Sequence, residues 1–185
     1  EDLQGSDPAT IFVGWYNGHP DYRDLQYDLS NVRRVAVIGN GNVAMDVARI
    51  LARSIEELSK TDIADYALEA LKKSAVEEIY LLGRRGPAQA AFTNPEIREL
   101  TEMPITDLIV EPKDLELDEL NQEFLDQATE QVHQRNIDTL TTQIARGEGT
   151  ASRKIRARFF VSPVEIHGSE RVAGMKLEIN RLTKD

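Results

Sequence analysis

The 185-residue sequence contains no cysteine. This absence excludes disulfide bonds, thiol catalysis and thiolate ligation of a metal cluster. Long apolar runs are also missing. Hydrophobic residues make up 41% of the chain, but no stretch approaches the roughly 18 apolar residues that a membrane span needs. No signal peptide is visible, so we expect a soluble protein located in the cytoplasm.

Positive charge is scarce as well. Lys and Arg total 22 against 32 Asp and Glu, which gives a net charge of -10. This charge opposes binding to nucleic acid and to anionic membranes, because neither field attracts an acidic surface. The three histidines, His19, His133 and His167, lie far apart in the sequence. They belong to no ligand motif, so we interpret them as surface residues and predict no metal site. No nucleophile–base pair stands out, and we assign no catalytic residue.

Residues 33–49 have the pattern of a strand, a glycine turn and a helix. Val35–Ile38 is the apolar run expected of a strand buried on both faces. The apolar residues that follow recur at helical spacing: Val43, Val47, Ile50 and Leu51. Gly39 would allow the tight turn, Gly41 the close approach of a pyrophosphate, and Ala44 the packing of helix on strand. We predict a dinucleotide site here; the alternative is a glycine turn that binds no ligand.

The residues after the next predicted strand, Val76–Gly83, indicate which dinucleotide binds. That strand ends beside the adenosine ribose, where an NAD site places Asp or Glu for the 2'-hydroxyl. This chain has Arg84 and Arg85 instead. Guanidinium groups can form paired hydrogen bonds with a phosphate, so we predict NADP(H) in preference to NAD(H). The alternative is a solvated pair of arginines in a turn.

The remaining periodicities predict a short strand at Ile11–Gly14 and an extra crossover helix beginning near Thr61. Asn94–Ile97 should open a short helix, and one long amphipathic helix should run from Leu117 to Gly147 or Gly149. Residues 155–161 and 172–182 should pair as a terminal antiparallel hairpin. Together they predict a three-layer α/β, Rossmann-like domain with a largely parallel sheet and a late antiparallel β extension.

Four segments resemble the NADP domain of the adrenodoxin reductase type of ferredoxin-NADP reductase: 12–18, 39–51, 83–93 and 159–163. The resemblance implies that Asn40, Gly41, Asn42 and Val43 contact the cofactor pyrophosphate, and we count Gly39, which makes the turn, among the cofactor-binding residues. It also implies that Arg84 and Arg85 bind the 2'-phosphate and that Glu96 lies at the far end of the cofactor. Glu96 has an alternative role as a capping charge at its helix start.

The family also implies what else the protein contains. Its enzymes bind FAD through a second glycine-rich turn, and this chain has one such turn. We therefore expect residues 1–185 to be an NADP-binding domain excised from a larger reductase, with 1–31 on the interdomain side. It should bind NADP(H), lack FAD and be inactive alone, because the flavin carries the redox chemistry. The alternative is a free-standing NADPH-binding or regulatory module.

The expected partners of the parent enzyme are the FAD domain of the same polypeptide and a ferredoxin-like iron–sulfur protein. In the family, basic residues dock the latter, but here Gln131–Asn136 contains only Arg135 as a basic residue. The other dense basic cluster, Arg153–Arg158, is either a docking surface or a solvated strand face. Trp15 and Tyr16 are either interdomain contacts or core aromatics.

Overall fold

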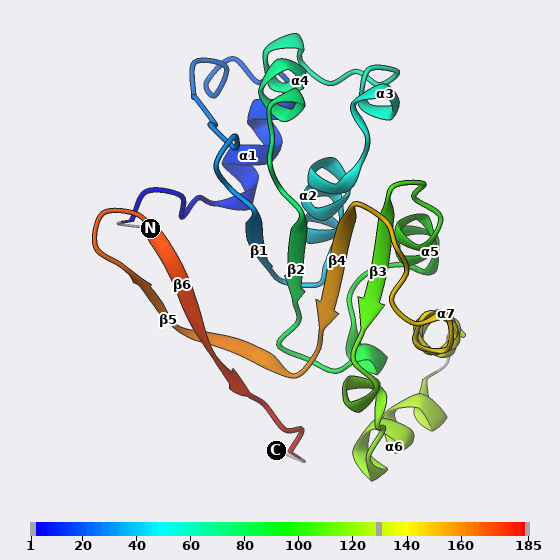
Figure 1. Ribbon diagram of the computed structural model, residues 1–185. Coiled ribbons are helices and arrows are strands. Elements are labelled where there is room, and N and C mark those ends of the chain that lie inside the picture. The colour runs from blue at the N-terminus through cyan, green and yellow to red at the C-terminus, as the bar shows by residue number, and fades with distance from the viewer. Residues whose placement is uncertain (1–2, 129–130, 184–185) are drawn as a thin grey trace.

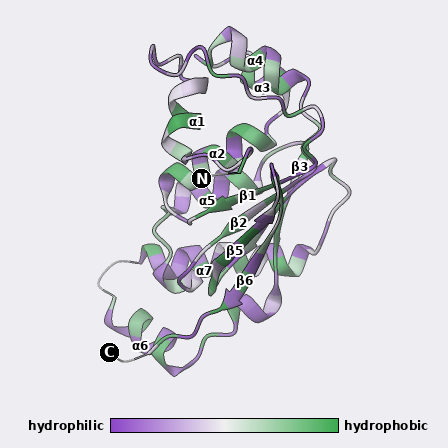
Figure 2. Cartoon of the chain, turned by 90° about the vertical axis from the view of Figure 1, so that its left-hand side faces the viewer, coloured by the Kyte–Doolittle hydropathy of each residue, from purple (hydrophilic) through white to green (hydrophobic). Residues whose placement is uncertain are grey.

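A parallel β-sheet forms the centre of the computed structural model, which describes residues 3–128 and 131–183 (Figure 1). Its strand order is β1-β2-β4-β3. The strands are β1 (Arg34–Ile38), β2 (Glu78–Leu82), β3 (Thr106–Val110) and β4 (Arg153–Arg158). Figure 2 shows hydrophobic residues gathered along β1 and β2 in the middle of the molecule.

Three of the described helices, α2, α5 and α7, pack on this sheet. The described helices are α1 (Ala9–Tyr16), α2 (Asn42–Ala52), α3 (Ile55–Leu58), α4 (Asp65–Lys72), α5 (Asn94–Thr101), α6 (Glu119–Gln127) and α7 (Val132–Arg146), with the 3-10 turns η1 (Pro87–Gln89) and η2 (Pro112–Leu115). Helix α2 packs on β1, β2 and β4, whereas α5 and α7 pack on β3. None of the described helices has the length and apolar character that crossing a membrane requires.

A separate antiparallel hairpin follows β4 and consists of β5 (Val161–Gly168) and β6 (Val172–Ile179). It extends as an arm beside the β1 edge of the sheet (Figure 1). At its far end Gln4 forms a bridge with Arg171. The α/β class, the parallel sheet and the late antiparallel extension are therefore confirmed.

The first strand of the hairpin is nevertheless not the one predicted. The alternation of residues 155–161 predicted that they form it, but the hairpin begins with the next strand, β5. Those residues mostly form β4, which lies between β2 and β3 and pairs with both in parallel. The chain reverses at Phe160, whose φ of 54° lies in the left-handed region. Alternation cannot distinguish a strand in the parallel sheet from a strand in the hairpin, because either can have one buried face. Here Ile155 and Ala157 are buried on the face of the sheet that α2 covers.

The strand predicted at Ile11–Gly14 is wrong, because these residues lie within helix α1. Phe12, Trp15 and Tyr16 recur at helical spacing and are buried together. The Trp15 side chain is 1% exposed, and its Nε1 donates to the Leu25 carbonyl at 3.1 Å. Of the two readings for Trp15 and Tyr16, the structure supports core aromatics.

The prediction that β1 is buried on both faces is also wrong. Val37 is buried against the helices, but Ala36 and Ile38 point to the opposite face, where Ile38 is 55% exposed. The physical reason is topological: β1 is an edge strand, and the described helices cover one side of it. An apolar run by itself does not show how many sides of a strand are covered.

The long helix predicted from Leu117 is two helices, α6 and α7. Ala128 ends α6 with an extended backbone, φ -66° and ψ 122°; residues 129–130, also within the predicted helix, lie outside the described residues. The predicted end is confirmed, because Gly147 caps α7 with φ 72°. The crossover helix is confirmed as well, but it begins at Asp65 and follows the additional short helix α3.

A buried ion pair fixes the carboxyl end of β4. The Asp114 carboxylate on η2 accepts from Arg158 Nε at 2.8 Å and from the Phe159 amide at 3.0 Å. Asp114→Ala should lower the free energy of unfolding by about 2 to 3 kcal/mol, because it leaves the Arg158 guanidinium and a buried N–H without a partner. Urea denaturation measures this change. Lys60→Ala, in an exposed pair, should leave the midpoint nearly unchanged, and an equal effect of both variants would contradict the assignment.

Candidate functional site

The turn that leaves β1 lies beside the end of β2. Ile38 pairs with Leu82 in parallel register, and the Gly39 amide donates to the Leu82 carbonyl at 2.8 Å. Gly39 has φ 123°, a conformation that L side chains rarely adopt, so the backbone requires glycine there. The turn and the residues after β2 therefore meet at the carboxyl edge of the sheet, where ligands bind in open α/β folds.

Gly41 differs from Gly39. Its φ is -96° and its ψ 179°, which any residue can adopt. A Cβ placed on Gly41 would have Ala91 Cβ as its nearest neighbour, at 3.9 Å. Neither the turn nor the packing requires glycine here, so the alternative of a glycine turn without a ligand leaves Gly41 unexplained.

The start of helix α2 is open. Gly41 is its N-cap, and no side chain caps the first turn, so backbone N–H groups and the positive end of the helix dipole remain available to an anion. Val43 in this turn is 47% exposed. Val43 lies in helix α2, as its spacing predicted, and Ala44 is buried, as its predicted packing against the strand requires.

The Asn40 side chain lies in the space that a side chain at position 83 would occupy, because Gly83 has none. A Cβ on Gly83 would lie 2.7 Å from Asn40 Nδ2. Gly83 cannot move aside easily, because its N–H donates to the Arg158 carbonyl and its carbonyl accepts from Val161. Asn40 Nδ2 is buried and has no hydrogen-bond partner in the described part of the chain. Buried polar groups are usually paired, so this amide marks a position where a ligand acceptor would fit.

Arg84 and Arg85 follow β2 in a segment that we call the arginine loop, residues 83–86. Both side chains are exposed, and neither guanidinium forms an ion pair or hydrogen bond with any described residue. Two free positive charges therefore stand at the edge of the sheet next to the glycine turn, in a chain with a net charge of -10.

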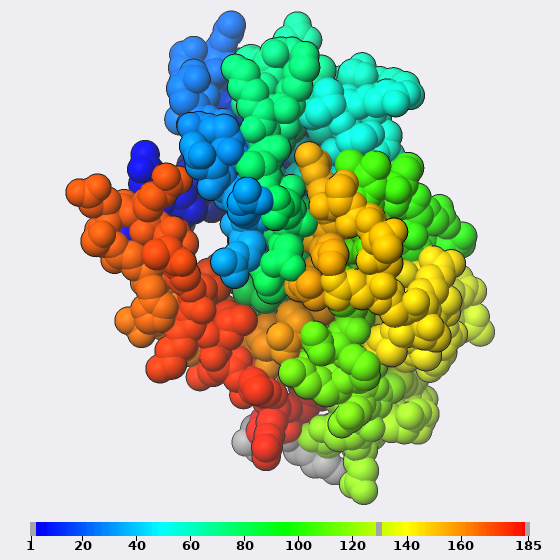
Figure 3. All heavy atoms as spheres, in the orientation of Figure 1, coloured from blue at the N-terminus to red at the C-terminus, as the bar shows by residue number. Residues whose placement is uncertain are grey.

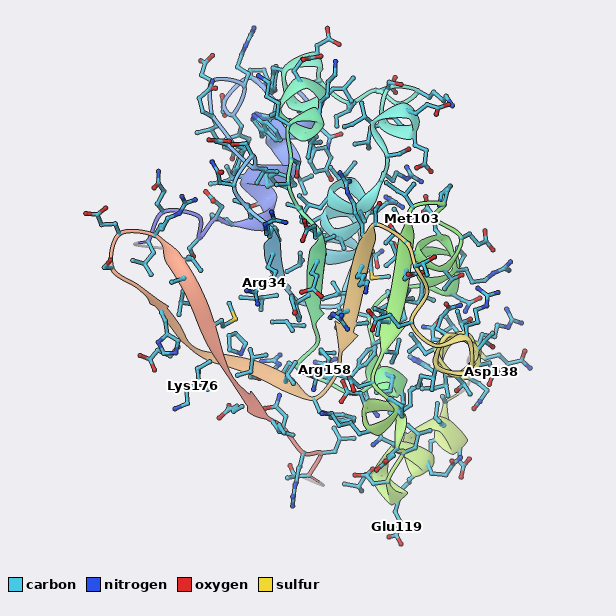
Figure 4. The ribbon with its side chains drawn as sticks, in the orientation of Figure 1. Arg34, Met103, Glu119, Asp138, Arg158 and Lys176 are labelled. Atoms are coloured by element: carbon cyan, nitrogen blue, oxygen red, sulfur yellow. The ribbon has the colours of Figure 1, made fainter. Side chains whose placement is uncertain are left out.

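The basic cluster on β4 is different, because its charges are engaged within the chain. Arg153 Nη1 donates to the carbonyls of Leu51 and Arg53 at 2.9 and 2.7 Å. Lys154 and Arg156 contact Glu148, and Arg158, labelled at the end of β4 in Figure 4, binds Asp114. These four side chains hold the sheet together, which argues against both a free docking surface and a merely solvated face.

Ion pairs on the uncovered sheet face also shift the titration of their acids. Hydrogen bonding from Arg156 holds the pKa of Glu78 below its usual value, and hydrogen bonding from Lys154 does the same for the pKa of Glu148. Both carboxylates therefore stay ionised and paired at neutral pH.

Glu96 caps the helix that carries it. Its Oε2 accepts from the Thr93 amide at 2.6 Å and from the Thr93 hydroxyl at 2.9 Å, which forms a capping box at the start of α5. Thr93 is the N-cap, and α5 begins at Asn94 as predicted. His19 and His167 are exposed and His133 is half-buried. Among the described residues, no three His, Cys, Asp or Glu lie close enough to hold a metal ion.

A cavity of about 1390 Å³ opens from the glycine turn. It lies between β1, the N-terminal segment and the hairpin, which contributes Ile166 and Met175. Figure 3 shows the hollow between the orange and red hairpin and the blue N-terminal part. The exposed side chain of Ile38 belongs to this lining.

Comparison with known proteins agrees with this geometry. The chain is 45% identical over 185 residues to the NADPH-ferredoxin reductase FprA of Mycobacterium tuberculosis, covering all of this chain and 40% of that protein. It is 50% identical over 123 residues to the mitochondrial NADPH:adrenodoxin oxidoreductase of Arabidopsis thaliana, covering 63% of this chain and 26% of that protein. The solved structure of M. tuberculosis FprA in complex with NADPH superposes with a TM-score of 0.89 at 43% identity, over all of this chain and 40% of that one.

This chain is homologous to one domain of the adrenodoxin reductase type of ferredoxin-NADP reductase. The resemblance seen in the four sequence segments is confirmed. The chain spans about two fifths of the length of the FprA relatives it matches. No family model matches it.

Two features of the site were missed from sequence. Gly83 was read as the end of a strand, although its lack of a side chain makes room for Asn40. The hydrogen-bond partners of the arginine loop, which are backbone groups of residues 158–161 and the Asn180 side chain, lie more than 70 positions later in the chain. The role of Gly83 had one signal in the sequence, a glycine directly before two arginines. The distant partners of the arginine loop had no signal in the sequence.

Gly83→Ala should force the Asn40 side chain out of its space and lower the free energy of unfolding by about 1 kcal/mol. Adding Asn40→Ala should restore most of this loss, because the smaller side chain removes the overlap. Thermal denaturation of the two single variants and the double variant gives the coupling. Gly174→Ala is the matched control, since a Cβ there meets nothing within 4 Å. Strictly additive effects would contradict the contact.

Proposed function

We propose that this chain binds NADP(H) as one domain of a flavin-dependent ferredoxin-NADP reductase. The observation that carries the proposal is Gly41, a glycine that neither backbone conformation nor packing requires, at the uncapped start of α2. The space left by its missing side chain would admit the cofactor pyrophosphate to the helix start. Asn40, with its unpartnered amide, supports the same assignment.

The preference for NADP(H) rests on Arg84 and Arg85. Because they have no acidic partner among the described residues, binding a 2'-phosphate would not first require an ion pair to break. Each guanidinium can donate two parallel hydrogen bonds to phosphate oxygens. An NAD site would need an acidic residue at this position, and the chain has none there.

The remaining assignments follow the same scheme. Gly39, Asn42 and Val43 complete the turn around the pyrophosphate. The contact of Glu96 with the far end of the cofactor stays a prediction, because the capping box already accounts for its Oε2. Substitution to Gln would keep the cap and remove the charge.

For the whole protein we propose electron transfer between NADPH, FAD and a ferredoxin-like iron–sulfur protein. The support is that the M. tuberculosis relative is named an NADPH-ferredoxin reductase and the A. thaliana relative an NADPH:adrenodoxin oxidoreductase. FAD would belong to another domain of the same polypeptide, and the NADP domain would present the nicotinamide to it. A cytoplasmic location remains part of this proposal.

Replacing both arginines tests the cofactor preference. The wild-type chain should bind NADPH more tightly than NADH, and the variant with Arg84→Ala and Arg85→Ala should lose about 2 to 4 kcal/mol of NADPH affinity while NADH affinity barely changes. Titration calorimetry measures both ligands. A control with Arg23→Ala and Arg146→Ala removes two exposed charges elsewhere and should leave the preference intact. Equal wild-type affinities for NADPH and NADH would refute the assignment.

Gly41→Val tests the phosphate role of the turn. The variant should fold normally, because a Cβ meets only Ala91 at 3.9 Å, yet it should lose at least about tenfold in NADPH affinity, or roughly 1.4 kcal/mol. Melting temperatures with and without NADPH measure both effects. Gly39→Val is the contrast: at φ 123° it should lower the melting temperature without ligand. A low melting temperature of ligand-free Gly41→Val would contradict the conclusion that the fold does not require glycine at position 41.

A further inference from the structure

The arginine loop is held from behind by the chain that leaves β4. The Gly83 amide donates to the Arg158 carbonyl at 2.8 Å, Val161 donates to the Gly83 carbonyl at 3.0 Å, and Phe160 donates to the Arg85 carbonyl at 3.2 Å. These are backbone bonds, so they constrain the path of the loop whatever side chains it carries. They make the loop an extra connection of the sheet rather than a free turn.

One further bond to the loop comes from a side chain. Asn180, directly after β6, donates from Nδ2 to the Arg84 carbonyl at 2.9 Å. The same nitrogen lies 2.8 Å from Ser162 Oγ on β5, and the Asn180 amide donates to the Phe160 carbonyl at 2.7 Å. Asn180 therefore joins both strands of the hairpin to the arginine loop, and only its bond to Arg84 and Ser162 depends on the residue type.

The bond acts on the peptide group between the two arginines. The Arg84 carbonyl belongs to the same planar unit as the Arg85 amide, so fixing this carbonyl fixes ψ of Arg84 and φ of Arg85. Those two angles decide the directions in which both side chains leave the backbone. Among the described residues, the Asn180 bond is the one hydrogen bond to this peptide plane, whereas the backbone bonds at Gly83 and at the Arg85 carbonyl hold the planes on either side. Losing it would leave the plane between the two arginines the least constrained part of the loop.

Phe160 packs against the loop at Gly86. It has a φ of 54°, and a Cβ on Gly86 would lie 2.2 Å from its ring atom Cζ. The missing side chain of Gly86 thus lets the ring lie directly on the loop. The Phe160 ring and the Asn180 side-chain amide, which lie just before β5 and just after β6, thus both contact the arginine loop.

We propose that Asn180 is a positioning residue for recognition of the 2'-phosphate. It touches no cofactor atom itself; it orients the peptide plane from which Arg84 and Arg85 project, so that both guanidinium groups are preorganised for one phosphate. The hairpin would thereby contribute to the choice between NADPH and NADH. This inference rests on the proposed function, because it presupposes that the arginines bind that phosphate.

Asn180→Leu tests the proposal, since leucine is similar in size and lacks the donor. NADPH affinity should fall about three- to tenfold, as expected for one hydrogen bond, while NADH affinity stays within about twofold of the wild type. Ser162→Ala is the matched control: it removes the other partner of Nδ2 but leaves the bond to Arg84, so the preference should persist. An unchanged preference in Asn180→Leu, or an equal loss for both cofactors, would overturn the positioning role while the proposed function stands.

A measurement on the unaltered chain covers the case in which Asn180→Leu does not fold. The side-chain amide signals of Asn180 in a nitrogen–proton NMR spectrum should shift when adenosine 2',5'-bisphosphate is added and stay in place with 5'-AMP. No shift with the bisphosphate, despite binding, would refute the inference alone. Absence of bisphosphate and NADPH binding by the wild-type chain would instead refute the proposed function together with it.

Discussion

The hydrogen bond from the Gly39 amide to the Leu82 carbonyl, 2.8 Å long, holds the ends of two neighbouring parallel strands at one level. Parallel strands all end at the same edge of a sheet, so the segments that follow β1 and β2 are brought together although more than 40 residues separate them. The glycine turn and the arginine loop become parts of one site for this reason. Every other feature of the site is arranged around that shared edge.

Charge is distributed unevenly around the same edge. Arg153, Arg156 and Arg158 on β4 contact carbonyls or acids of their own chain and stabilise the sheet. Arg84 and Arg85, one strand away, have no such partner among the described residues. Both guanidinium groups are exposed and need break no ion pair to bind an anion, and this contrast with β4 favours an anionic ligand at the loop.

The hairpin has a structural role that its exposure alone would not suggest. Most residues of β5 and β6 are exposed, yet Val161 and Asn180 at its base connect to the arginine loop. The arm therefore reaches from the carboxyl edge of the sheet to the N-terminal bridge at Gln4 and Arg171, and it lines a cavity between these two points. A β extension late in the chain is thus coupled to a site built from its first half.

The sequence by itself determined the local chemistry. Gly39, Gly41 and Ala44 marked the strand–turn–helix unit, and the two arginines after β2 marked the predicted phosphate site, because each depends on residue types within a few positions of one another. The length of the helices after Leu117, the strand reading of Ile11–Gly14 and the burial of Ile38 were wrong. They depend on which surfaces other elements cover. Only the tertiary structure decided that β4 enters the sheet between β2 and β3, that Gly83 makes room for Asn40, and that Asn180 reaches the Arg84 carbonyl. These contacts join residues about 40 to 100 positions apart, and no local periodicity encodes such pairings, because they arise when strands from distant parts of the chain end at the same edge.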